Sequence, residues 1–217
     1  MKAALKKANL PVKEIISLLK KEYPGAGCTL DFKTPHQLLV ATVLSAQCTD
    51  ERVNIVTKDL FKKYISIEDY ATADISELEN DIHSTGFFRN KARSIKESAR
   101  VLVVEHGGKM PENMEELIKL PGVGRKTASV ILGAAFGLAE GIVVDTHVIR
   151  LSQRLGFSRQ KDASKIENDL MEIITKKDWI IFSHLLILHG RNVCKARKPD
   201  CGKCVVSKLC PSAGLFL

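Results

Sequence analysis

The chain has 217 residues, of which 45% are hydrophobic and 27% are charged, so it can bury a core and is not a disordered chain. Its net charge of +8 indicates an acidic partner, most often a nucleic acid. No apolar run reaches the roughly 18 residues of a membrane span, and the start lacks the apolar stretch of a secretory signal. We therefore expect a cytoplasmic protein that does not bind a membrane.

Apolar residues recur every three to four positions along most of the chain, which is the period of amphipathic helices. We find no convincing strand pattern, internal repeat or linker, so the sequence predicts an all-α fold. Thr49 and Asp145 each precede a helical segment and are placed as N-caps. The expected helices cover residues 12–23, 36–46, 50–64, 76–82, 88–105, 113–119, 125–136, 146–155, 163–175 and 178–189.

The segment LPGVGRKTA, residues 120–128, lies between two expected helices. Pro121 would stop the first helix, while Gly122 and Gly124 allow positive φ and leave backbone N–H groups uncovered. Arg125 begins the second helix, whose free N–H groups form an anion site. This order is typical of a helix–hairpin–helix that holds a DNA phosphate; an ordinary glycine turn is the alternative.

Four of the six cysteines fall within 17 residues, with the spacing Cys-x6-Cys-x2-Cys-x5-Cys: Cys194, Cys201, Cys204 and Cys210. In a reducing compartment such a cluster indicates a metal centre rather than disulfides. Zinc fits four thiolates, but only one CxxC pair is present. An iron–sulfur cluster accepts uneven spacing more readily, so both metals stay open and iron–sulfur is favoured.

Positive charge gathers at both ends of the chain. Residues 1–21 hold six Lys against one Glu, and residues 189–210 hold six basic residues against Asp200. Between the first two clustered cysteines, Lys195, Arg197 and Lys198 would stand on a loop held by the metal. Such a loop suits phosphate contacts, although a solvated charge run is the alternative.

Lys126 and Asp145 form the third candidate site. Lys126 stands in the first turn of a helix, where the positive end of the dipole favours the neutral amine that acts as a nucleophile. On pattern alone, a phosphate contact for Lys126 and an N-cap for Asp145 explain both residues equally well.

Together these motifs strongly resemble the endonuclease III family of DNA glycosylases. The resemblance extends over nearly the whole chain and includes Asp145 in VVDTH, 19 residues after Lys126, and the four cysteines. The segments LSAQCTD (44–50) and STGFFRNKA (84–92) also look like that family.

The resemblance implies two helical lobes: a six-helix barrel lobe over residues 28–138 that contains the hairpin, and a second lobe of residues 1–27 plus 139–217 with a 4Fe–4S cluster. DNA would lie between the lobes with a damaged base flipped out. Double-stranded DNA with oxidised pyrimidines or abasic sites would be the partner of a monomer, at the nucleoid of a prokaryote.

The resemblance also implies residue roles. Lys126 would attack the sugar C1′, expel the base and form a Schiff base, and β-elimination would then cut the strand. Asp145 would assist by electrostatics and proton transfer. Gln47 would fill the gap left by the flipped base, and Phe87 matches an apolar wedge that is usually Leu.

Two other functions stay open. Monofunctional adenine or thymine mismatch glycosylases resemble this chain in fold, but they lack the lysine at position 126. A non-catalytic DNA-binding or electron-transfer protein would need the hairpin and the cysteines but would have no use for Lys126 and Asp145 together.

Overall fold

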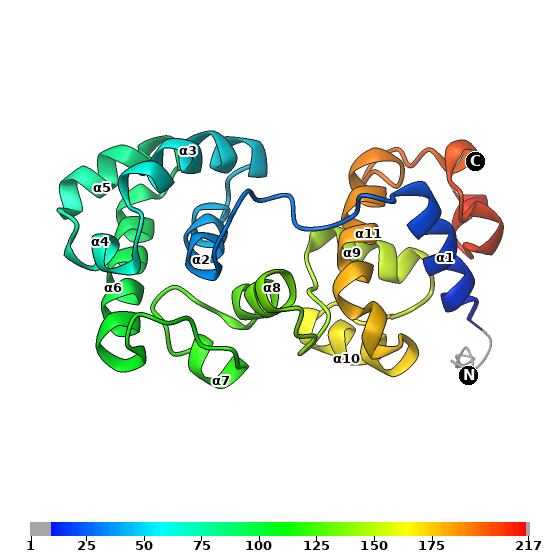
Figure 1. Ribbon diagram of the computed structural model, residues 1–217. Helices are drawn as coiled ribbons and strands as arrows, with labels where there is room; N and C mark the ends of the chain where they lie inside the picture. Colours follow the sequence, from blue (N-terminus) through cyan, green and yellow to red (C-terminus); the bar gives the residue numbers. More distant parts are fainter. Residues whose placement is uncertain (1–9, 216–217) are drawn as a thin grey trace. The chain divides into compact units, whose positions relative to one another are not determined.

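The structure is a computed structural model, and it describes residues 10–215. Within those residues every regular element is a helix and no strand occurs, which confirms the all-α fold class (Figure 1). No helix in this range is long and apolar enough to cross a membrane. The lysines of the basic N-terminus at positions 2, 6 and 7 lie outside the described residues.

The α-helices of the described chain are α1 (Val12–Glu22), α2 (Pro35–Leu44), α3 (Asp50–Lys63), α4 (Ile67–Thr72), α5 (Ile75–Ile82), α6 (Phe88–His106), α7 (Met114–Leu117), α8 (Arg125–Phe136), α9 (Thr146–Arg154), α10 (Ala163–Ile173) and α11 (Trp179–Asn192). The short 3-10 helices are η2 (His83–Thr85), η3 (Lys176–Asp178), η4 (Cys201–Lys203), η5 (Ser207–Leu209) and η6 (Ala213–Leu215).

The expected helices are present, with ends that lie up to three residues from the expected ones; α2, for example, ends at Leu44 and α11 at Asn192. Two further points differ. Helix α4 was not expected, because six residues are too few for a periodic pattern, although its capping box of Ser66 and Asp69 is a readable start signal. Helix α7 ends at Leu117, so the turn at Ile118, and not Pro121, stops it. Both predicted N-caps are confirmed, because Thr49 accepts from the N–H of Arg52 and Asp145 from that of Val148.

The chain divides into two compact units. Unit 1 joins the N-terminal segment up to Gly27 to the residues from Gly141 onward, and unit 2 is Cys28–Glu140. Each unit has its own hydrophobic core, centred on Leu19, Leu151 and Phe182 in unit 1 and on Leu38, Leu102 and Ile131 in unit 2. Each unit therefore buries enough apolar surface to form a compact body.

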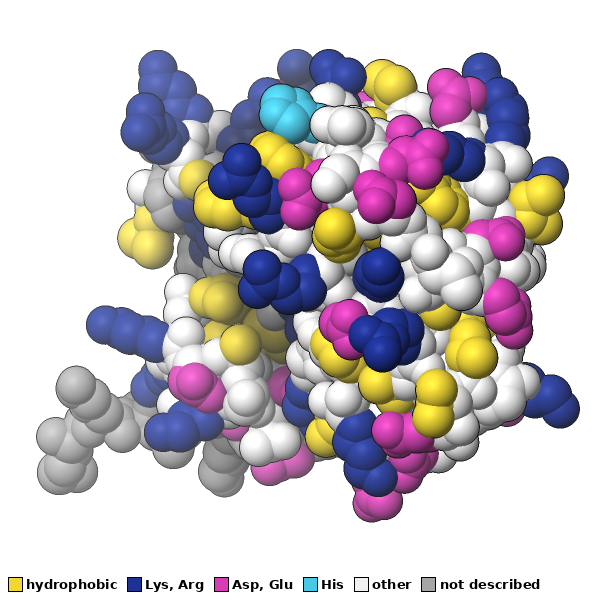
Figure 2. Space-filling model, turned by 90° about the vertical axis from the view of Figure 1, so that its left-hand side faces the viewer, with side chains coloured by type: hydrophobic (Ala, Val, Ile, Leu, Met, Phe, Trp, Pro, Cys, Tyr) yellow, Lys and Arg dark blue, Asp and Glu magenta, His cyan; other side chains and the backbone are white. Residues whose placement is uncertain are grey.

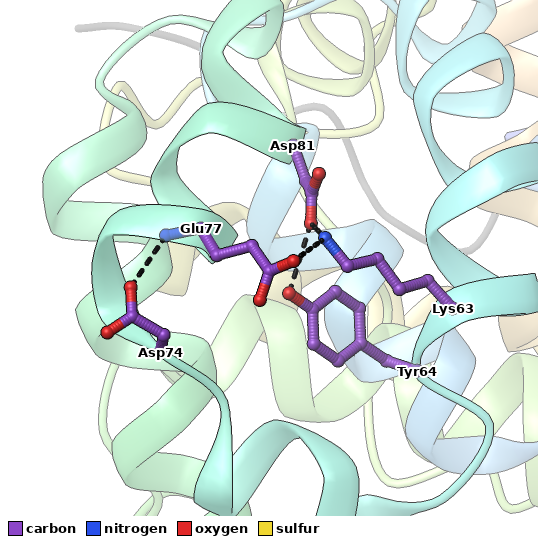
Figure 3. Close-up of polar contacts among 5 residues, drawn as sticks. All are labelled: Lys63, Tyr64, Asp74, Glu77 and Asp81. Carbon is purple, nitrogen blue, oxygen red and sulfur yellow. Dashed lines mark hydrogen bonds and ion pairs between the residues drawn. The ribbon is translucent and has the colours of Figure 1, made fainter.

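Unit 2 contains helices α2–α8, and polar contacts tie the end of α3 to α5 (Figure 3). Lys63 Nζ lies 2.8 Å from Glu77 Oε1 and also pairs with Asp81, which accepts from the Tyr64 hydroxyl at 3.0 Å. Burial, with a smaller contribution from Asp81, raises the pKa of Tyr64 to about 12, so the hydroxyl keeps its proton.

One outer face of unit 2, over α4–α6, carries side chains of both charges interspersed with single hydrophobic residues (Figure 2). This mixture is typical of a solvated surface.

In unit 1, α1 packs against α11, so the N-terminal helix joins the C-terminal part of the chain. Lys20 on α1 donates to Asp178 Oδ1 at 2.6 Å, just before α11. Hydrogen bonding from Lys20 holds the pKa of Asp178 below its usual range, despite the opposing effect of burial.

Candidate DNA-binding site, catalytic residues and metal centre

The segment between α7 and α8 is a tight hairpin packed on α6. Leu120 and Val123 bury their side chains, and the Ser98 hydroxyl on α6 donates to the carbonyl oxygen of Pro121 at 2.6 Å. Among the described residues no side chain caps the start of α8. The first-turn N–H groups of α8 therefore remain suited to an anion.

The two hairpin glycines differ in their structural role. Gly122 has φ of +77°, and a Cβ there would stand 2.7 Å from the Ser94 Cβ, so both backbone and space require glycine. Gly124 has φ of −92°, and a Cβ there would meet nothing within 4 Å. Both glycines allow positive φ, but only Gly122 adopts it; Gly124 leaves the start of α8 uncovered.

Gln47 and Phe87 are the non-glycine residues of the described chain with positive φ, at 54° and 50°. For a glutamine or phenylalanine this backbone costs on the order of 1–3 kcal/mol, and such strain concentrates at functional sites. Both side chains are exposed, Phe87 by 63%. Together with Gly122 and Thr127 they line one pocket of ≈ 280 Å³ in unit 2. The fold therefore brings three predicted site residues from separate segments to one cavity.

Lys126 is exposed in the first turn of α8, directly after Arg125, and belongs to unit 2. Asp145 belongs to unit 1 and is half-buried, with Oδ1 2.8 Å from the backbone nitrogen of Val148. The side chain of Asp145 is thus held in place by its cap, and its second oxygen is not engaged by that bond.

Further along α9, the side chain of Arg150 links the helix to the segment before the cysteines. Its Nη2 donates to the carbonyl oxygens of Gly190 and Cys194 at 3.0 and 3.1 Å and lies 3.1 Å from His147 Nδ1. Burial lowers the pKa of His147, so the ring is neutral and Nδ1 accepts from Arg150.

The four clustered cysteines line one cavity in unit 1, together with Arg154 and His189. Arg154 Nη1 lies 3.2 Å from Cys194 Sγ, and His189 Nε2 lies 3.2 Å from Cys204 Sγ. In residues 10–215, no three His, Cys, Asp or Glu side chains are grouped closely enough to hold one metal ion. The four cysteines line a cavity instead.

This donor set fits an iron–sulfur cluster. Four thiols line one cavity, and Arg154 lies beside Cys194, where it would offset the negative charge of the cluster. Burial raises the pKa of Cys204 to about 11 and also raises that of Cys210, so both thiols stay protonated until a cation compensates them. Binding of iron would therefore release protons.

The basic loop after Cys194 is exposed at Lys195, Arg197 and Lys198. Arg154 fixes its backbone by donating to the carbonyl oxygens of Lys195 and Ala196, each at 2.8 Å. The loop therefore presents its cationic side chains outward from a held backbone.

Comparison with known proteins agrees with these sites. The model of the HhH-GPD superfamily of base excision DNA repair proteins matches residues 40–176, and that of the iron–sulfur binding domain of endonuclease III matches residues 194–210. The endonuclease III of Synechocystis sp. is 58% identical over 200 residues, which are 92% of this chain and 91% of that protein. The chain belongs to the endonuclease III family.

Other members of the endonuclease III family and its structural relatives extend this result. The Bacillus subtilis endonuclease III is 48% identical over 87% of this chain and 86% of its own length. A trapped endonuclease III–DNA covalent intermediate matches with a TM-score of 0.89 and 45% identity over 98% of this chain and 99% of that one. A thermostable thymine-DNA glycosylase matches with a TM-score of 0.83 and 27% identity, over 94% of this chain and 96% of that one.

This member of the endonuclease III family is a base excision repair enzyme, a DNA glycosylase with AP lyase activity that binds DNA and carries a 4Fe–4S cluster. No sequence motif points to a role for Arg154 or for Lys91. Lys91 is buried and is one of the residues that line the same pocket as Gln47 and Phe87. A lysine on an otherwise amphipathic helix gives no local signal that it is buried.

Proposed function

We propose that Lys126 is the nucleophile with which this chain removes oxidised pyrimidines from duplex DNA and cuts the strand at abasic sites. The observation that carries the proposal is the exposed amine in the first turn of α8, beside an N-terminus suited to a phosphate. A relative trapped as a covalent intermediate with DNA supports it.

The reaction has two stages. The Lys126 amine attacks C1′, and the base leaves with the electron pair of the glycosidic bond. The C1′–O4′ bond then breaks, O4′ takes a proton, and a protonated imine remains between C1′ and the lysine nitrogen. Loss of a proton from C2′ then breaks the C3′–O bond, and water hydrolyses the imine to release the amine. Asp145 stabilises the cationic sugar and transfers protons.

The other predicted residues position the DNA. Gly122, Gly124 and Arg125 hold a phosphate at the start of α8, and Lys195, Arg197 and Lys198 make further backbone contacts. Gln47 and Phe87 enter the duplex at the flipped base. Unit 2 is then the lobe of the hairpin and unit 1 the lobe of the cluster, whose role here is to hold the basic loop. The enzyme acts as a monomer on chromosomal DNA.

Borohydride trapping tests this assignment. Wild-type protein, incubated with a duplex that carries an oxidised pyrimidine or an abasic site, should become covalently attached through Lys126. Lys126→Gln should bind the duplex with the hairpin intact but lose trapping and strand cleavage. As the control, Lys119→Gln removes an exposed lysine that pairs with Glu116 at 2.7 Å, and it should trap like wild type.

Two results would contradict the assignment. Undiminished base release by Lys126→Gln would indicate a water nucleophile and the monofunctional class. Binding of damaged DNA by the wild type without any cleavage would indicate a non-catalytic protein.

A further inference from the structure

The side chain of Lys91, on the first turns of α6, is 5% exposed and points into the protein. Its Nζ donates to the carbonyl oxygen of Leu44 at 2.7 Å and to that of Thr85 at 2.9 Å. A buried ammonium is costly unless it is paired or hydrogen-bonded. Burial lowers the pKa of Lys91, and the nearby Cys48 partly opposes that shift. The mechanism proposed above makes no use of this lysine.

Both acceptors lie at the ends of segments that lead to strained residues. Leu44 is the last residue of α2, three positions before Gln47, and its carbonyl is one that a helix end leaves without an intrahelical partner. Thr85 ends η2, two positions before Phe87. The backbone N–H of Lys91 also donates to the carbonyl oxygen of Phe87 at 3.2 Å. One residue thus contacts the backbone of both turns.

Left-handed Gln47 and Phe87 persist only if their surroundings hold them there. A positive charge at the C-terminal end of α2 stabilises that helix end, and the same ammonium fixes the turn before Phe87. Gln47, Phe87 and Lys91 line one pocket, so the residue that holds the two turns shares a pocket with the residues that the turns present.

We propose that Lys91 is a positioning residue, whose buried ammonium sets the spacing of the two turns that carry Gln47 and Phe87 into DNA. The inference rests on the proposed role of those two residues. Lys91 touches no reacting atom in this scheme. It acts by keeping both side chains in the geometry needed when a base leaves the stack.

The test compares Lys91→Met, which keeps an unbranched chain but no donor, with Lys96→Met. Lys96 lies on the same helix and donates to a backbone carbonyl, that of Ala73, at 2.7 Å, away from the two turns. Single-turnover cleavage of a duplex with a paired lesion should fall about tenfold to a hundredfold in Lys91→Met and stay near wild type in Lys96→Met. Thermal unfolding shows how much stability each variant loses.

A spectroscopic readout separates positioning from stability. 2-Aminopurine placed opposite the lesion brightens when it unstacks, so wild type and Lys96→Met should raise its fluorescence on binding. Lys91→Met should raise it less at saturating protein. If Lys91→Met does not fold, Lys91→Gln, which keeps one N–H donor group, takes its place. It should likewise give slower cleavage and a smaller rise in fluorescence than wild type.

A double-mutant cycle gives the decisive result. In a Gln47→Ala, Phe87→Ala background, Lys91→Met should change the cleavage rate less than about threefold, because the residues it positions are already gone. A full additional loss in that background would overturn the proposal, as would wild-type fluorescence and cleavage in folded Lys91→Met. If the Gln47→Ala, Phe87→Ala pair itself cleaves normally, the assigned role of those two residues fails, whatever the behaviour of Lys126.

Discussion

Asp145 Oδ1 accepts a hydrogen bond of 2.8 Å from the backbone N–H of Val148, so the proposed acid–base residue is also the N-cap of α9. The two roles can be separated by substitution, because an asparagine keeps an accepting oxygen and loses the charge.

Asp145→Asn should therefore fold with nearly wild-type stability and turn over about 10²–10⁴-fold more slowly, as when an acid–base group is lost. Asp145→Ala should lose the same activity and, in addition, about 1 kcal/mol of stability through the missing cap. Turnover assays and chemical unfolding measure both quantities.

The matched control is Asp162, which caps α10 through Lys165 N at 3.0 Å in the same unit. Asp162→Ala should lose similar stability without slowing turnover. Wild-type turnover in Asp145→Asn would show that Asp145 is only a cap.

The hairpin glycines should respond differently to an added methyl group. Gly122→Ala forces a Cβ toward Ser94 at a positive φ, so it should cost about 1–3 kcal/mol of folding free energy. Gly124→Ala should cost less than about 1 kcal/mol, because φ is ordinary and the space is open. Its methyl nevertheless stands at the start of α8, where a phosphate approaches, so it should weaken DNA binding. Wild-type affinity of Gly124→Ala in a titration would place the phosphate elsewhere.

The purified protein should contain about four iron atoms per chain and little zinc. Arg154→Met removes the donor to Cys194 Sγ and both bonds to the basic loop, so an iron chelator should bleach the visible absorbance several-fold faster. Exposed Arg159→Met should bleach at the wild-type rate. Metal analysis that finds one zinc and no iron would refute the cluster.

Charge reversal of Arg197 and Lys198 should weaken binding to duplex DNA whatever its sequence. Affinity falls as salt rises, and each lost phosphate contact makes the slope of log affinity against log salt less steep by about 0.9. Loss of both contacts should therefore make the slope less steep by about 2. The same reversal at Lys161 and Lys165, exposed residues in unit 1, leaves the basic loop intact and should change the slope less. An equal effect of the two pairs would mean that only net charge matters.

Local chemistry explains where the sequence predicted the structure correctly. The sequence predicts Thr49 and Asp145 as caps, because a cap needs only a side-chain oxygen placed before a helix. Gly122 was recognised because a tight turn between helices favours a residue without Cβ. The sequence pattern does not predict helix α4, because its burial against α6, through Ile67 and Tyr70, is a tertiary effect.

The sequence alone determined the all-α class, the hairpin, the cysteine cluster and the candidate nucleophile, since spacing along the chain encodes each of them. The tertiary structure decided that Gln47 and Phe87 share a pocket, that Gly124 needs no special backbone, and that Lys91 is buried. Lys91 donates to Leu44, which is 47 positions earlier in the chain, and to Thr85, which is six positions earlier. Arg154 contacts Cys194, which is 40 positions later. Such contacts depend on how helices pack in space, and no local pattern of side chains specifies them.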